Sequence, residues 1–414
     1  MPRLASRGVI LVYETASEAL ILKDPEPARE YEAGNDWWQN LGNSVSSTPN
    51  IADVEAIWRR FESQGIVSPG QSLDFTKAWI SRFDIAPENQ LYVTGQARGK
   101  TIALLPLKRV RRFGVDVLTW FAGSHVGCNA PLIDREMFAK LSVLERINVW
   151  QQMQRGLFGA DLVYLHGVPV FEGEDYFAQL GRFVSQDYLY RAVFDNWQEC
   201  AAKQHTRSRR KHDRQQGAKL AAMGKVEFVE LSGKDAGLDQ ALETMFKQKA
   251  ARFKQWGVEN PFAEQKVREF YGDLIKGDNE LKGKLHVLRL DGQIIAVRYN
   301  LAHQKTMFSL ISSMSEREEL KPGSPGKQNV FNSIKHAFNA NYTAYDMGAG
   351  YSDEKRHWCN KIIPLRTHYV PLSAKGESVT RLHRTKSLAQ KAIKDNDRLF
   401  SWFKYVRGFV FRGL

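Results

Sequence analysis

Short apolar runs from Leu285 to Met314 predict three consecutive strands. The runs are LHVLRLDGQ, IIAVRYNLA and TMFSLISSM, and apolar runs of this length between turn residues are typical of strands. Lys321–Gly326 (KPGSPG) can continue neither a strand nor a helix. Apolar residues then recur at the spacing of one helical face, which predicts an amphipathic helix with Val330, Phe331, Ile334, Ala337 and Phe338 on that face. A further short strand follows near Tyr345.

The same plan occurs earlier in the chain. Leu91–Val110 and Leu285–Gln304 both begin Leu-x-Val, reach a glycine turn, and resume with Ile-Ala three residues after that glycine. Phe158–Gly167 in turn parallels Phe338–Gly348, since each passes through a polar turn into a short strand that ends at glycine. Two pairs of similar segments that occur in the same order predict a duplicated domain.

The duplication predicts an α/β fold with two similar domains, each a mixed, mostly antiparallel sheet flanked by helices. We assign the first domain to residues 51–195 and the second to residues 196–375, with an N-terminal extension over 1–50 and a C-terminal segment over 376–414. The helices expected between the strands are Ile51–Gln64, Met137–Leu157, Arg207–Lys219, Leu238–Phe253 and Phe262–Ile275.

Charge is concentrated in two segments. The net charge is +13, and Lys203–Lys225 and Lys375–Leu414 each carry +7, which leaves −1 for the rest of the chain. This distribution favours two local anionic partners over a diffusely basic surface. The sequence has no apolar run near the ~18 residues that span a bilayer, and no convincing signal peptide. Its three cysteines have no metal-ligand spacing and fit a reducing cytosol, so we expect no metal site.

The turn before the amphipathic helix is a candidate anion site. A helix N-terminus offers free backbone N–H groups and the positive end of the helix dipole. The candidate cofactor-binding residues are Gly323, Ser324, Pro325, Gly326 and Lys327. The alternative is an ordinary strand-to-helix connection.

These residues carry a family resemblance. The strand meander, Ser324-Pro325-Gly326, and the segment with Asp346, Gly348, Gly350 and Lys355 resemble GNAT-like acyltransferases of the cellulose-biosynthesis (CelD/BcsL) type, distant relatives of Fem-type peptidoglycan aminoacyltransferases. Trp197 and the basic helix after it also fit the family. The resemblance covers about residues 197–372, is weaker over 68–195 and is absent from both tails. Glu354 stands where the family has an aromatic residue.

The resemblance implies tandem GNAT-like domains and transfer of an acyl group from acetyl-CoA or another acyl-CoA, with no permanently bound cofactor. The acceptor would be an amine or hydroxyl of a sugar, sugar nucleotide or other cell-envelope precursor. Such transfer requires a held thioester, a stabilised oxyanion and removal of a proton. Asp346 and Lys355 are the candidate catalytic residues, with an ordinary surface ion pair as the alternative. His125, in the equivalent loop of the first half, is a further candidate base, unless it is simply solvated.

The basic helix is the candidate acceptor site. Its densest cluster would attract an anionic acceptor through Arg207, Arg210, Lys211 and Arg214. The cluster lacks the interleaved aromatic residues that stack on bases. We therefore expect a nucleic-acid partner only if the donor is aminoacyl-tRNA, as in a Fem-like enzyme. Two other possibilities stay open, namely a solvated basic helix and a non-catalytic GNAT-like module in an envelope assembly.

Basic residues occur among many aromatic and apolar residues through Leu388–Leu414. This composition is typical of a helix that lies on an anionic membrane surface. The alternative is an aromatic helix packed on the body of the protein. We therefore expect a cytoplasmic protein with peripheral membrane contact through residues 376–414.

Overall fold

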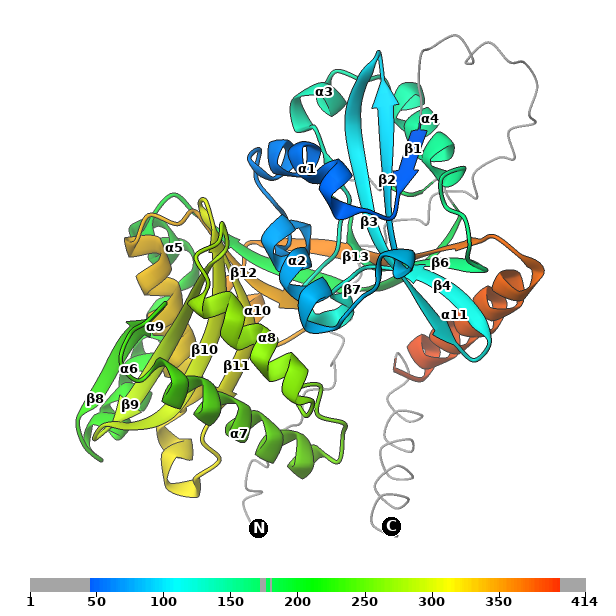
Figure 1. The fold of residues 1–414 in the computed structure, drawn as a ribbon. Helices are drawn as coiled ribbons and strands as arrows, with labels where there is room; N and C mark the ends of the chain where they lie inside the picture. The colour runs from blue at the N-terminus through cyan, green and yellow to red at the C-terminus, as the bar shows by residue number, and fades with distance from the viewer. Residues whose placement is uncertain (1–44, 172–175, 179–180, 395–414) are drawn as a thin grey trace.

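A single mixed sheet runs through the molecule (Figure 1). The computed structural model describes residues 45–171, 176–178 and 181–394. The strand order is β1-β2-β3-β4-β6-β13-β7-β12-β11-β10-β9-β8, with β5 paired to β3. Neighbours are antiparallel except for β4 with β6 and β11 with β12. Helices flank the sheet, which confirms the predicted α/β class with mostly antiparallel strands.

The first half contains the predicted hairpin and helices, with one break. Ser142 and Glu145 form a capping box that starts a new helix, so the single helix expected over 137–157 is two helices. The elements are β1 (Val45–Thr48), η2 (Ile51–Val54), α1 (Glu55–Glu62), η3 (Pro69–Gln71), α2 (Leu73–Arg82), η4 (Pro87–Asn89), β2 (Gln90–Ala97), β3 (Lys100–Arg112), β4 (Val115–Thr119), η5 (Gly123–His125), β5 (Leu132–Ile133), α3 (Arg135–Ala139), α4 (Val143–Gln154), β6 (Leu162–Pro169) and β7 (Arg182–Val193).

The second half has the predicted meander and amphipathic helix. The short strand predicted near Tyr345 is β12, and a short helix, α10, follows it over Asp353–Trp358. The elements are α5 (Trp197–Gln204), α6 (Arg207–Ala221), β8 (Val226–Leu231), α7 (Leu238–Trp256), α8 (Gln265–Lys276), β9 (Lys282–Leu290), β10 (Gln293–His303), β11 (Thr306–Met314), η6 (Glu318–Gly323), α9 (Pro325–Asn339), β12 (Ala344–Ala349), α10 (Asp353–Trp358), β13 (Lys361–Pro371) and α11 (Ala374–Lys394).

The two halves repeat one another down to their turns. The β2–β3 hairpin turns through Arg98 and Gly99 (φ 51° and 72°), and the β9–β10 hairpin turns through Asp291 and Gly292 (φ 49° and 77°). Positive φ at both central residues is the geometry of the turn that matches strand twist. In each half the fourth strand leads through at least one α-helix to a parallel neighbour, β4 to β6 and β11 to β12.

The last strand of each half pairs with the other half. β7 lies beside β12, β13 lies beside β6, and β7 and β13 pair with each other at the centre of the sheet. This exchange joins the halves through continuous backbone hydrogen bonds. The domain boundaries at 195/196 and 375/376 stay a prediction, and strand pairing crosses the first of them.

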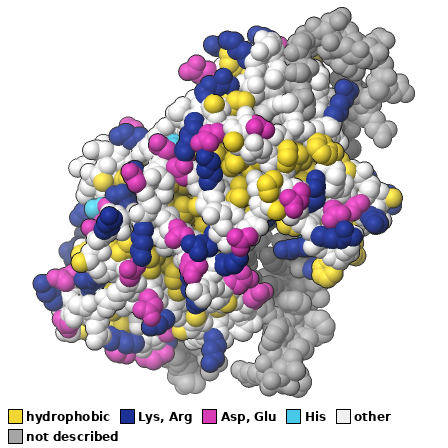
Figure 2. Space-filling view, in the orientation of Figure 1, with side chains coloured by type: hydrophobic (Ala, Val, Ile, Leu, Met, Phe, Trp, Pro, Cys, Tyr) yellow, Lys and Arg dark blue, Asp and Glu magenta, His cyan; other side chains and the backbone are white. Residues whose placement is uncertain are grey.

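Helices of both halves also share one apolar core. Phe75 of α2 meets Phe270 of α8 edge to face at 5.0 Å, and Trp79 meets the same ring at 4.9 Å. α7 and α8 cover one face of the second-half strands, and α9 covers the other. Lys and Arg are interspersed with Asp and Glu on the face in Figure 2.

The C-terminal segment begins with a docked helix. Gly376 of α11 lies against the backbone of Asp161, where a Cβ atom would come within 1.8 Å of the carbonyl oxygen. The Tyr369 hydroxyl and His383 Nδ1 are 2.7 Å apart. The helix α11 therefore contacts the sheet through Gly376 and His383. Residues 395–414, with most of the predicted membrane segment, lie outside the described residues. Among the described helices, none has the length and apolar content to cross a bilayer.

Candidate functional site

The site lies where β11 and β12 separate. The two strands pair in parallel only over Thr306–Phe308 and Ala344–Asp346. β11 continues to Met314, whereas β12 turns away at Gly348, whose φ is 76°. Beyond Phe308, the edge of β11 that faces β12 therefore has no strand partner among the described residues. Such an edge offers backbone groups to a ligand.

Asp346 is buried at the start of this separation. It is 4% exposed, and its Oδ2 accepts a hydrogen bond from Arg191 Nε at 2.5 Å. Its Oδ1 accepts from the Gly348 N–H at 2.7 Å. Burial acts to lower the pKa of Arg191, but the Asp346 carboxylate outweighs it and raises that pKa above its ordinary value. Asp346 thus holds the β12 turn and pairs with Arg191 of β7.

Lys355 lies at the same end of β12, on α10. Its Nζ donates to the carbonyl oxygens of Ala349 at 2.5 Å and Gly348 at 3.4 Å. Burial lowers the pKa of Lys355 to about 8, although the Asp346 carboxylate acts in the opposite direction. A lysine with this pKa exchanges a proton near neutral pH. The structure thus brings the two predicted catalytic residues to one strand end without a direct ion pair between them.

Two arginines at the site were missed by the sequence analysis. Arg191 lies opposite Asp346 on β7. Arg298 of β10 is 9% exposed, and its NH1 donates to Ser309 Oγ of β11 at 2.9 Å. A charged residue inside the apolar run IIAVRYNLA was the available signal for Arg298. The sequence pattern did not indicate Arg191, because Arg191 meets Asp346 only through the pairing of β7 with β12 of the other half.

The predicted anion-binding turn adjoins β11. Ser324 precedes α9 and lies in the left-handed region at φ 48°. Pro325 is the first helical residue, a position whose N–H has no partner within the helix, so proline loses no hydrogen bond there. Gly326 faces Met314 at the end of β11, where a Cβ atom would come within 2.8 Å of the sulfur. Gly323 lies against Leu220 of α6. The turn and the strand separation therefore belong to one region.

Glu354 connects this turn to α6 and α10. It lies 3.5 Å from Lys327 Nζ and also accepts a hydrogen bond from Arg209. Arg209 in turn contacts Asp213 at 3.1 Å. Glu354, which stands where the family has an aromatic residue, thus places a carboxylate between Lys327 and Arg209 beside the turn. Arg209, which the sequence analysis did not single out, is the inward-facing cation of α6.

The four predicted acceptor-binding cations lie on the outer face of α6. All four are exposed, and none forms an ion pair with another described side chain: Arg207, Arg210, Lys211 and Arg214. They remain available to an external anion.

His125 lies in a different place from Asp346 and Lys355. Its Nδ1 is 3.2 Å from the Tyr271 hydroxyl, and it lines a cavity of about 800 Å³ together with Trp79 and Lys108. Burial, with a contribution from the Lys108 charge, lowers the pKa of His125 to about 4. An imidazole with this pKa is a weak base at pH 7, so the expectation of a base near pH 7 finds no support. Gly127 of the same loop, in contrast, lies against Gly348.

Comparisons relate one segment of the chain to a known domain family and the fold to solved structures. Residues 207–356 match the acetyltransferase (GNAT) domain family. The match to the solved structure of FemX covers 81% of this chain and 99% of the FemX chain, with 10% identity and a TM-score of 0.50. The match to L-PGS from Bacillus licheniformis covers 81% of this chain and 97% of that one, with 12% identity and a TM-score of 0.46. The match to a tandem GNAT protein from the clavulanic acid biosynthesis pathway covers 80% of this chain and 99% of that one, with 8% identity and a TM-score of 0.41.

No curated protein sequence matches the chain significantly. The fold is similar to that of FemX, and Asp346, Lys355 and the Gly323–Lys327 turn lie within the segment that matches the GNAT acetyltransferase domain. Residues 207–356 thus resemble the GNAT acetyltransferase domain.

Proposed function

We propose that the protein transfers an acyl group from acyl-CoA to an amine or hydroxyl of a cell-envelope or exopolysaccharide precursor, as an enzyme of the CelD type. The observation that carries the proposal is the separation of β11 and β12, with Lys355 at one side and the α9 turn at the other. Residues 196–375 would form the acyl-CoA-binding domain and residues 51–195 its partner domain.

The acyl thioester would lie along the free edge of β11, where backbone N–H groups stabilise the oxyanion. The turn at Gly323–Lys327 would bind the CoA pyrophosphate. The neutral amine of Lys355 would take the proton as the acceptor's nitrogen or oxygen attacks the thioester carbonyl carbon. The C–S bond then breaks, and the departing CoA thiolate receives that proton. Asp346 acts as a positioning residue through Arg191 and the Gly348 turn.

The acceptor is proposed to be anionic. The four exposed cations of α6 have no described acidic partner, and Glu354 links the same helix to the α9 turn. A sugar nucleotide or similar phosphorylated precursor would therefore approach along α6.

Reversing the charge of Lys327 should weaken CoA binding. Lys327→Glu places a second carboxylate next to Glu354 at the α9 N-terminus, where an anion would bind. Charged hydrogen bonds contribute about 1.5–3 kcal/mol, so the dissociation constant for CoA should rise about 10–100-fold. Isothermal titration calorimetry measures it directly.

Lys335→Glu is the matched control, because Lys335 is exposed on the same helix, two turns further along. It should leave the CoA affinity near that of the unmodified protein. Equal affinity in Lys327→Glu and the unmodified protein would remove the turn from the CoA site.

A second candidate is a Fem-like aminoacyltransferase that uses aminoacyl-tRNA. The fold likeness to FemX and the unpaired cations of α6 favour it. Saturable CoA binding with acyl turnover supports the CoA-dependent enzyme. RNA binding that weakens with Arg210→Glu, without CoA binding, would support the tRNA-dependent one. CoA binding without any turnover would indicate a non-catalytic module.

Residues 395–414 are proposed to bind an anionic membrane surface from the cytoplasmic side. Each Lys or Arg near such a surface contributes about 1 kcal/mol. Deleting 395–414, which spares the docked helix α11, should abolish sedimentation with phosphatidylglycerol vesicles and leave CoA binding intact. Added salt should weaken binding of the full chain, and phosphatidylcholine vesicles should retain little of it. Unchanged sedimentation after the deletion would contradict the proposal.

A further inference from the structure

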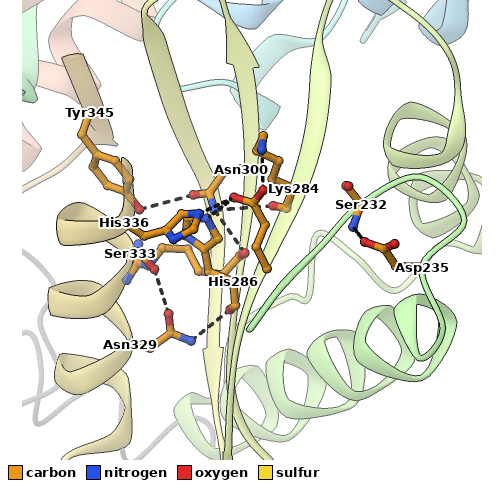
Figure 3. Close-up of polar contacts among 11 residues, drawn as sticks. Ser232, Asp235, Lys284, His286, Asn300, Asn329, Ser333, His336 and Tyr345 are labelled. Carbon is orange, nitrogen blue, oxygen red and sulfur yellow. Dashed lines mark hydrogen bonds and ion pairs between the residues drawn. The ribbon is translucent and has the colours of Figure 1, made fainter. Parts of the chain in front are cut away.

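Two histidines and a glutamate converge at the edge of the sheet, away from the site above (Figure 3). Glu230 is on β8, the last strand of the sheet, and His286 lies directly opposite it on β9. His336 reaches the same point from α9. Each histidine turns Nε2 toward Glu230 Oε2, at 3.1 Å for His286 and 3.0 Å for His336.

We propose that Glu230, His286 and His336 form a binding site for a divalent cation of the zinc class. The three ligand atoms lie within 4.8 Å of one another. Ligands about 2.0–2.1 Å from zinc at tetrahedral angles are about 3.3 Å apart. The separations of Glu230 Oε2 from the two histidine nitrogens, 3.1 and 3.0 Å, are therefore a few tenths of an ångström short of those in a zinc site. Neutral imidazole nitrogens and a carboxylate oxygen are also ligands that zinc prefers.

The surroundings fix the three side chains in this arrangement. Phe228 of β8 packs against both imidazoles, with ring centroids 5.4 Å from His286 and 5.9 Å from His336. The Asn329 side chain donates to the His286 carbonyl oxygen at 3.1 Å, and Ser333 bonds to Asn329 at 2.9 Å. These two hydrogen bonds join α9 to the backbone of β9, and ligands held on paired strands and a packed helix lose little freedom when a metal binds.

The carboxylate is prepared for monodentate binding. Lys284 donates to Oε1 of Glu230 and leaves Oε2 to the two histidines. Carboxylates that bind metals are themselves usually held by hydrogen bonds from neighbouring groups, and Lys284 fills this role at Oε1.

The site has one side open to solvent. His286 is fully buried, whereas the His336 side chain is 38% exposed. A metal bound by three protein ligands would thus keep a fourth position for water. The cation would join α9 to the edge strand β8, so its role is to fix the helix whose other end carries the Gly323–Lys327 turn. The inference does not depend on the proposed acyl transfer.

Zinc titration of the chelator-treated full-length protein tests the site. Calorimetry should show about one zinc ion per chain, and Co²⁺ should give the visible absorption of a four-coordinate site. His336→Ala should weaken zinc binding about 100-fold or more, since loss of an outer-shell partner alone costs 10–100-fold. Glu230→Gln should also weaken it strongly. His212→Ala, which removes an exposed histidine on α6, is the control and should bind zinc like the unmodified protein.

Two further readouts separate this site from adventitious binding. Zinc should raise the thermal unfolding midpoint of the unmodified protein and slow amide hydrogen exchange in α9 and β8, and it should do neither in His336→Ala. No stoichiometric binding by the unmodified protein, or equal binding by His336→Ala, would overturn the proposal. Binding without protection of α9 would overturn its structural role.

Discussion

Asp346→Asn is expected to lower the free energy of unfolding by about 3 kcal/mol or more, because removing one charge of a buried ion pair costs about 3–5 kcal/mol. The substitution leaves the Arg191 guanidinium buried and opposite a neutral amide. It also weakens the acceptor of the Gly348 N–H that shapes the end of β12. Urea denaturation followed by circular dichroism measures the loss.

Asp353→Asn is the control for this prediction. Asp353 is exposed on α10, and surface substitutions usually change stability by less than about 0.5 kcal/mol. Turnover and CoA affinity of Asp346→Asn are then compared at a temperature where the protein is folded. Normal stability with collapsed turnover would make Asp346 a catalytic residue and contradict the positioning role.

Lys355→Met is expected to lower kcat about 10²–10⁴-fold, the usual contribution of a positioned general base, while changing CoA affinity little. Methionine keeps the length of the side chain and removes the amine that contacts the Ala349 carbonyl. Release of CoA thiol from acetyl-CoA provides the assay before an acceptor is identified. Lys361→Met, an exposed position at the start of β13, should retain full activity.

The pH profile gives an independent check of Lys355. The base acts in its neutral form, and its pKa is lowered to about 8 by burial. The rate of the unmodified enzyme should therefore rise as pH increases toward 8 and level off above it. Lys355→Met should lose this rise. An unchanged profile in Lys355→Met would assign the proton transfer to another group.

Local pattern was sufficient for most elements of the second half. β11 has the predicted bounds of 306–314, and α6 begins at the predicted Arg207. These segments succeed because strand and helix periodicities are properties of neighbouring residues. The single helix predicted over 137–157 is wrong in detail, because α3 ends at Ala139 and the Ser142 capping box begins a second helix, α4.

The site was predictable only in part. Asp346 and Lys355 were selected from the family resemblance and from their places before and after a glycine loop at a strand end, and the structure places both at the end of β12. Arg191 escaped notice because it enters through the exchanged strand β7. His125 was a reasonable candidate by position, but burial beside Lys108 lowers its pKa to about 4.

The sequence by itself determined the duplicated plan, the order of strands and helices within each half, and the two basic segments, since each depends on residues close together in the chain. Only the tertiary structure decided which strands pair across the halves, because strand exchange preserves the sequence pattern. It also decided the partner of Asp346 and the meeting of Glu230, His286 and His336. These contacts join residues 50 to 155 positions apart, and no local spacing encodes them.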